Sequence, residues 1–235
     1  MTDSAKKDFD AMREAMIEAI EIHARLAAEH TGRANIAQGV LKVMGEVPRH
    51  EFVPFEIKPF AYLDRPLPIG CGKTISQPFM VALMTDLLDV GTGDMVLEIG
   101  TGFGYQAAVL AALAKQVYSV EVIEELADEA KARFERLAIK NIAVRVADGA
   151  LGWSEHAPYD RIMVTAAPDL IPAGLLGQLK PGGRMVIPAG IRDAQQLMLV
   201  TKDDGGKIEA TELLAVRFSE LESDDDLDGA TMRGA

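Results

Sequence analysis

Apolar residues recur every three or four positions in the first part of the chain. In residues 5–30 they include Met16 and Ile20, with Asp, Glu and Lys between them. This spacing is typical of an amphipathic helix with one buried face. A shorter helix is predicted over residues 35–45, so we expect residues 1–60 to form an N-terminal helical extension.

From Asp94 onward, short apolar runs alternate with longer amphipathic segments. The apolar runs predict strands over residues 95–99, 116–122, 142–146, 161–165, 184–188 and 196–202. The longer segments predict helices over residues 105–114, 124–137 and 171–179. Strands that alternate with helices in this way form βαβ units. We therefore predict an α/β fold over residues 61–218, with a Rossmann-like, doubly wound and mostly parallel sheet.

Two segments have neither pattern. Residues 64–76 contain two prolines and two glycines, which predict a loop without regular structure, followed by a helix over residues 77–88 that begins near Pro78. Residues 219–235 contain six acids and one base, and we expect them to form a disordered acidic tail.

The composition excludes several classes of protein. No apolar run approaches the roughly 20 residues of a membrane-spanning helix, and we find no signal peptide. The net charge of −12 argues against broad attraction to nucleic acid. The single cysteine, Cys71, rules out an intrachain disulfide and favours a cytoplasmic location. The four histidines show no metal-ligand spacing, so we predict no metal site.

A glycine-rich turn separates the first predicted strand from its helix. Gly100, Gly102 and Gly104 follow the pattern G-x-G-x-G, which lets the backbone approach a ligand closely. The dinucleotide fingerprint G-x-G-x-x-G is not met, because Tyr105 occupies the place of its third glycine. Taken alone, the turn also suits a tight connection that binds nothing.

Acidic residues follow the next two predicted strands. Glu121 lies about 20 residues after the glycine turn, where Rossmann-type sites bind ribose hydroxyls, and Asp148-Gly149 could meet an adenine ring. Each acid alone also suits a solvated carboxylate or a helix cap. Polar groups at three successive strand ends, however, indicate a nucleotide-like cofactor at the carboxyl edge of the sheet.

Several motifs resemble one family. The run Val96-Leu97-Glu98-Ile99-Gly100-Thr101-Gly102-Phe103-Gly104 resembles the first motif of class I S-adenosylmethionine-dependent methyltransferases. Three further runs resemble the protein-L-isoaspartate O-methyltransferases within that class. They are Val47-Pro48-Arg49-His50-Glu51-Phe52, Thr74-Ile75-Ser76-Gln77-Pro78 and Lys180-Pro181-Gly182-Gly183. The resemblance extends over about residues 35–218.

The resemblance implies a function and a site. The family methylates the free carboxylate of L-isoaspartyl residues in damaged proteins and peptides, with S-adenosyl-L-methionine as cofactor. Carried over, Ser76 is the catalytic residue, and Thr74, Ile75 and Gln196 bind the substrate. The implied cofactor-binding residues are Gly100, Thr101, Gly102, Gly104, Glu121, Asp148 and Gly149.

The chemistry needs little of the enzyme beyond alignment. A carboxylate with a pKa near 4 is already a nucleophile at neutral pH, so no general base is required. Ser76 would then orient the carboxylate by a hydrogen bond, although it also suits a helix N-cap. Phe79 departs from the family, which often has histidine there, and residues after Phe218 depart from its usual ending.

Two rival functions remain open at this point. One is methylation of another carboxylate acceptor by the same fold, and the other is cofactor binding without catalysis. An NAD-dependent oxidoreductase is disfavoured by the glycine spacing.

Overall fold

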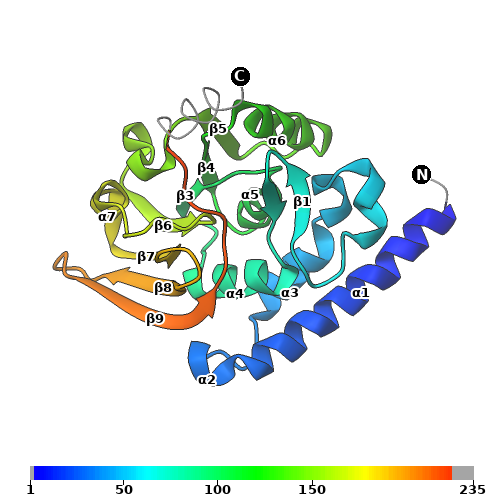
Figure 1. Cartoon of the computed structure of the whole chain (residues 1–235), viewed down its shortest axis with the longest axis horizontal. Helices are drawn as coiled ribbons and strands as arrows, with labels where there is room; N and C mark the ends of the chain where they lie inside the picture. The colour runs from blue at the N-terminus through cyan, green and yellow to red at the C-terminus, as the bar shows by residue number, and fades with distance from the viewer. Residues whose placement is uncertain (1–2, 224–235) are drawn as a thin grey trace.

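The computed structural model describes residues 3–223, which form a seven-stranded sheet covered by helices on both faces (Figure 1). The strand order is β5-β4-β3-β6-β7-β8-β9. Pairs from β5 to β7 are parallel, and β8 and β9 are antiparallel to their neighbours. The strands are β3 (Met95–Ile99), β4 (Gln116–Glu121), β5 (Ile142–Val146), β6 (Tyr159–Val164), β7 (Leu179–Ala189), β8 (Gln195–Lys202) and β9 (Ile208–Val216). The predicted fold class is confirmed.

Helices connect the parallel strands and precede them. The N-terminal helices are α1 (Asp3–Leu26), α2 (Ala28–Thr31), α3 (Gln38–Glu46), η1 (Arg49–Phe52) and η2 (Phe55–Phe60). The others are α4 (Pro78–Leu88), α5 (Tyr105–Ala111), α6 (Glu124–Arg136), η3 (Gly149–Leu151), η4 (Ser154–His156) and α7 (Ala173–Gln178). Among the described residues, no helix is long and apolar enough to cross a membrane.

Alternation along the strands divides the apolar residues between two cores. Val96 and Val117 face a large core that also contains Met16 and Ile20 of α1. Leu97 and Ile99, on the opposite face of the sheet, contribute to a smaller core under α7. The N-terminal helices therefore share a continuous core with the sheet, and Figure 1 shows α1 running along α3 and α4.

The predicted first helix is interrupted. Its last turn is a separate short helix, α2, which ends at Gly32 with the positive φ of 65° expected at a helix C-terminus.

The segment 64–76 is more regular than predicted. It contains a hairpin of β1 (Leu67–Gly70) and β2 (Lys73–Ile75). Cys71 and Gly72 both have positive φ, as a tight two-residue hairpin turn requires. Pro68 is tolerated because the two-stranded ladder leaves one edge of each strand unpaired, where a missing N–H costs nothing. The prediction of an irregular loop is wrong here.

Two predictions near the C-terminus also need correction. Strand β9 was not predicted, because six of its nine residues are exposed and its first five residues have no apolar run. The tail was expected to be disordered from residue 219, yet residues 219–222, here called the C-terminal strap, have defined positions. The backbone of Ala167 bonds both Ser219 and Leu221. The rest of the expected tail, 224–235, lies outside the described residues.

Candidate active site

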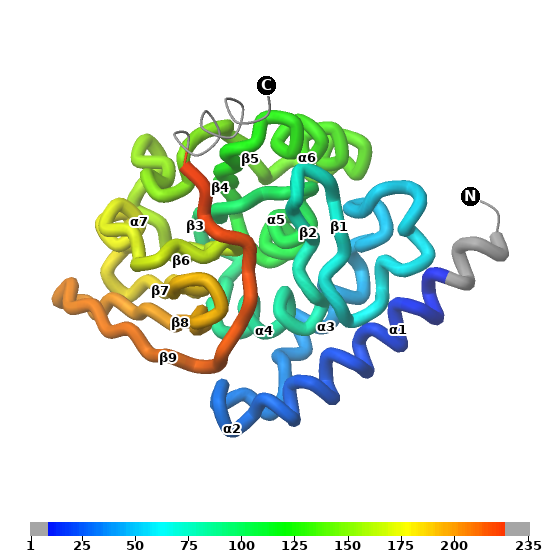
Figure 2. Tube along the Cα trace, in the orientation of Figure 1, coloured from blue at the N-terminus to red at the C-terminus, as the bar shows by residue number. Residues whose placement is uncertain are grey.

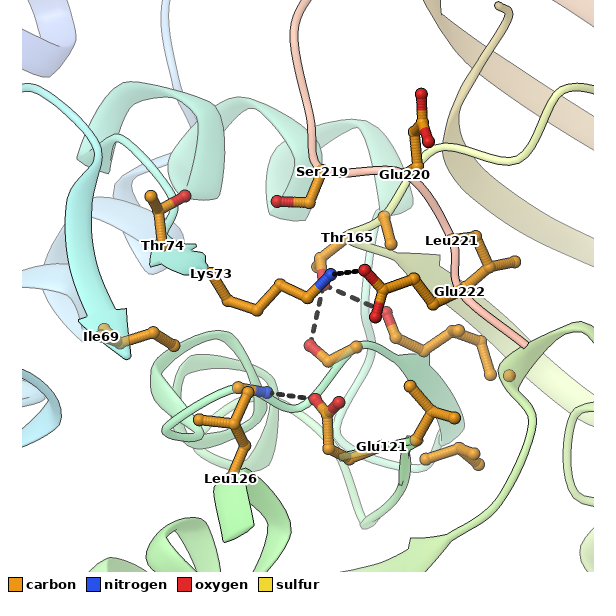
Figure 3. Close-up of a pocket in the computed structure, with 17 residues that line it drawn as sticks. Ile69, Lys73, Thr74, Glu121, Leu126, Thr165, Ser219, Glu220, Leu221 and Glu222 are labelled. Carbon is orange, nitrogen blue, oxygen red and sulfur yellow. Dashed lines mark hydrogen bonds and ion pairs between the residues drawn. The ribbon is translucent and has the colours of Figure 1, made fainter. Parts of the chain in front are cut away.

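A cavity opens at the carboxyl ends of β3, β4 and β6 (Figure 3). Its floor is the glycine turn, and Glu121 lines it from the end of β4. The β1–β2 hairpin and the C-terminal strap form opposite walls, and Figure 2 shows these two segments next to each other. Lys73 of the hairpin donates to Glu222 of the strap at 2.6 Å, so an ion pair joins the two walls.

The turn requires glycine for steric reasons. Gly100 has φ of 92°, and a Cβ atom there would lie 2.5 Å from Thr165 Oγ1. Gly102 has φ of 53°, and a Cβ atom would approach the Ile69 side chain across the cavity at 3.1 Å. The absence of side chains therefore keeps open a cradle that an elongated ligand could fill.

Glu121 fixes the turn to the end of β4. Its carboxylate accepts hydrogen bonds from the backbone N–H groups of Gly102 at 2.8 Å and Ile123 at 3.1 Å. The side chain is almost fully buried and lines the cavity. These bonds leave lone pairs for the hydroxyls of a ribose, so the residues present fit an adenosyl ligand.

Asp148 and Gly149 follow β5, as predicted. Asp148 caps η3 by accepting from the N–H of Ala150 at 2.8 Å. Asp148 also lines a side opening of the cavity, between the strap and the start of η3. Gly149 lines the cavity itself. The structure thus places both residues and the glycine turn at one edge of the sheet.

Glu98 lies beneath the turn in a fully buried position. Burial raises the pKa of its carboxyl to about 8. Ser119 donates to Glu98 at 2.5 Å and is itself 2.6 Å from the hydroxyl of Thr101. The neutral acid therefore anchors a chain of hydroxyl groups that ends in the glycine turn.

A second cavity of about 430 Å³ adjoins the first. It lies between the start of α4, the end of β9 and the strap, and Ser76 lines it. Thr74, Thr165 and Ser219 line both cavities. A group bound in one cavity would therefore meet a group bound in the other beside these three hydroxyl side chains.

Ser76 is held by its backbone and not by its side chain. Arg49, which is fully buried, donates to the Ser76 carbonyl at 2.6 Å and to the Ala61 carbonyl at 2.8 Å. Its burial lowers its pKa to about 10, so it remains charged at neutral pH. The N-cap of α4 is Gln77, without a side-chain cap. The hydroxyl of Ser76 is thus not used as a helix cap.

The structure brings most predicted site residues together. A further opening between the two cavities is lined by four of these residues: Thr74, Ile75, Thr101 and Gly104. Gln196 is the exception, because it lines none of the four openings described here. Its neighbour Gln195 faces the interior and bonds the backbone of Phe218 through both side-chain atoms.

Sequence reasoning missed three contributors to the site. Thr165 lines both main cavities, and its position at the end of a predicted strand was a usable signal. Lys73 and the strap carry no such signal, because their role depends on how the hairpin and the C-terminal segment pack. Among the described residues, no cluster of His, Cys, Asp and Glu is arranged to hold a metal ion.

Known proteins are similar to this chain over most of its length. Residues 23–226 match the model of the protein-L-isoaspartate (D-aspartate) O-methyltransferase family. Protein-L-isoaspartate O-methyltransferase 1 of a Polaromonas species is 52% identical over 92% of this chain and 91% of its own length. The enzyme of the same name from Cupriavidus necator is 55% identical over 89% of this chain and 81% of its own length.

Solved structures are similar over nearly the whole fold. One protein-L-isoaspartate O-methyltransferase has a TM-score of 0.77 at 30% identity, over 90% of this chain and 66% of that chain. A candidate enzyme of this kind from Plasmodium falciparum, in complex with S-adenosyl-L-homocysteine, has a TM-score of 0.75 at 24% identity, over 91% and 98% of the two chains. The family match and the bacterial relatives together show that this chain belongs to the protein-L-isoaspartate O-methyltransferase family.

Proposed function

We propose that this protein transfers a methyl group from S-adenosyl-L-methionine to the free carboxylate of L-isoaspartyl residues in damaged proteins and peptides. The observation that carries the proposal is the junction of two cavities at Thr74, Thr165 and Ser219. One cavity has the glycine cradle and acid of an adenosyl site, and the other contains Ser76. The relatives' names indicate which acceptor this arrangement serves.

The chain's residues would divide the work between the two cavities. S-adenosylmethionine, when bound, supplies a methyl group on a positively charged sulfur. Gly100, Gly102 and Glu121 would hold the adenosyl part, with Asp148 and Gly149 beside the adenine. The acceptor carboxylate is ionised at neutral pH and needs no base.

Ser76 would orient the acceptor carboxylate. Its hydroxyl would donate one hydrogen bond to a carboxylate oxygen, while Arg49 keeps the backbone of the Ser76 loop in place. The reaction then depends on alignment of an oxygen with the methyl group. Thr74 and Ile75 would line the approach of the substrate. The single, exposed Cys71 fits a reducing cytoplasm, where we place this activity.

A competition assay tests this proposal against its rivals. The protein is incubated with labelled S-adenosylmethionine, an isoaspartyl peptide and an excess of small carboxylic acids. We expect the label to appear in the peptide and the acids not to compete. Labelling of the acids would favour a different acceptor, and cofactor binding without any turnover would favour a non-catalytic role.

A further inference from the structure

The second cavity contains an ionisable side chain that the proposed mechanism does not use. His23, from the N-terminal helix α1, lines this cavity together with Ser76, Gln77 and Phe79. Its side chain is 41% exposed. The other ionisable residue of the lining is Arg217, and neither Asp nor Glu contributes to it. In a chain of net charge −12, a lining without acidic side chains does not repel a negatively charged methyl acceptor.

The packing of α1 explains how His23 reaches the cavity. Met16, Ile20 and Ala24 form the buried stripe of α1 and belong to the large core. His23 lies at the border of that stripe, three residues after Ile20 and next to Ala24. The stripe therefore places His23 against the start of α4, where its ring lies 5.6 Å from the ring of Phe79.

A buried carboxylate fixes the orientation of the His23 ring. Asp64, whose side chain is 7% exposed, lies 2.5 Å from Nδ1 of His23. Asp64 also accepts from the Gln77 side chain at 2.9 Å and from the backbone N–H of Phe79 at 2.8 Å. Three donors, from α1 and from the start of α4, thus hold this carboxylate. Because a carboxylate only accepts hydrogen bonds, Asp64 in turn keeps a proton on Nδ1 of His23.

The opposite ring nitrogen is available to a ligand. Among residues 3–223, Nε2 of His23 has no hydrogen-bond partner. The ring of His23 is held in place through Nδ1, and its Nε2 is unbonded at the cavity. A side chain held in this way is preorganised to bind a ligand group. We infer that His23 binds the methyl-accepting substrate, and that its Nε2 accepts a hydrogen bond from a backbone N–H group of the isoaspartyl peptide in the second cavity. This inference rests on the proposed function.

Variants of His23 test the inference through substrate affinity. His23→Phe keeps an aromatic ring beside Phe79 but removes both nitrogens, and His23→Gln keeps a polar side chain. We expect KM for an isoaspartyl peptide to rise about tenfold in the Phe variant and less in the Gln variant. The kcat and the affinity for S-adenosylhomocysteine should change less than twofold. His30→Gln, at an exposed position of α2, is the matched control and should change nothing.

An unchanged KM in a folded His23→Phe variant would overturn the inference, and so would an equal loss of cofactor affinity. If both variants fail to fold, the wild-type protein provides the test. Its histidines are isotope-labelled, and their ring nitrogens are followed by NMR as an isoaspartyl peptide is added with S-adenosylhomocysteine present.

We expect the Nε2 signal of His23 to shift on peptide binding and that of His30 not to shift. Peptide that binds without moving the His23 signal would contradict the inference. Wild-type protein that neither binds nor methylates the peptide would instead contradict the proposed function, and the inference with it.

Discussion

Ser76 is the residue on which the proposed chemistry depends most directly. If its hydroxyl only orients an ionised carboxylate, Ser76→Ala should lower kcat by about ten- to a hundredfold, the effect of losing a hydrogen bond of about 1.5–3 kcal/mol. Cofactor affinity should change little, because the proposed adenosyl contacts lie in the other cavity. Single-turnover methyl transfer to an isoaspartyl peptide measures the loss of rate. Ser154→Ala, at an exposed position, serves as control. Normal turnover in Ser76→Ala would remove Ser76 from the mechanism.

Glu121 should affect the donor and not the acceptor. Glu121→Ala removes the carboxylate that would bind ribose and that also holds the N–H of Gly102. We expect cofactor binding to weaken by about 1–3 kcal/mol while the fold persists. Calorimetry with S-adenosylhomocysteine measures the change, and Glu135→Ala, at an exposed position of α6, serves as control. An affinity equal to that of wild type would exclude Glu121 from the cofactor site.

Glu98 gives the protein a defined dependence of stability on pH. Its pKa is raised to about 8 in the fold, so the folded state holds a proton that the unfolded chain releases at lower pH. Stability from this group is therefore fully present below the ordinary pKa of about 4.5. It is lost as the pH rises toward about 8.

Glu98→Gln, which cannot ionise, isolates this effect. We expect the unfolding free energy of wild type to fall relative to the variant by about 2 kcal/mol or more between pH 5 and pH 9. Denaturant unfolding at several pH values measures the difference, and other titrating groups cancel between the two proteins. Parallel pH profiles would mean that Glu98 does not carry the raised pKa.

At the scale of elements, the C-terminal strap yields a prediction that the sequence alone would have missed. The strap residues Ser219, Leu221 and Glu222 line the first cavity, which we propose as the cofactor site. The Lys73–Glu222 ion pair joins the strap to the hairpin. Removal of residues 219–235 should therefore weaken S-adenosylhomocysteine binding about tenfold or more. Removal of residues 224–235 alone should leave it nearly unchanged. Equal affinities of the two truncated proteins would contradict the role of the strap.

Elements were predictable where hydrophobic periodicity is strong. Strands β3 and β5 begin and end at the predicted residues, because each is a short apolar run beside a polar turn. Strand β9 escaped prediction since it is an exposed edge strand whose pairing with β8 supplies its regularity. The hairpin escaped because Pro68 and its glycines suggested irregular structure, whereas two residues of positive φ close a tight turn.

The site shows the same division between local and long-range information. The glycine turn and Glu121 were predictable, because strand ends at one edge of a parallel sheet must converge. The sequence did not predict that Lys73, His23 and the strap lie at the site, because each position depends on the packing of segments far apart in the chain. For Gln196, the side-chain alternation along β8 decided the outcome, because Gln195 and not Gln196 faces the interior.

At the scale of the whole molecule, the sheet holds two adjoining cavities, and we propose that the methyl donor and the acceptor meet at their junction. The sheet order brings the ends of β3, β4 and β6 together under the first cavity. Helices α1 and α4, strand β9 and the C-terminal strap contribute to the lining of the second cavity. Both binding sites therefore depend on one continuous fold, and specificity for the damaged residue should be a property of the second cavity.

The most direct measurement is methyl transfer from labelled S-adenosylmethionine to two peptides that differ only in an isoaspartyl or a normal aspartyl residue. The account predicts that the isoaspartyl peptide gains one methyl ester and that the aspartyl peptide gains essentially none. Equal labelling of the two peptides, or labelling of neither by a protein that binds the cofactor, would contradict it.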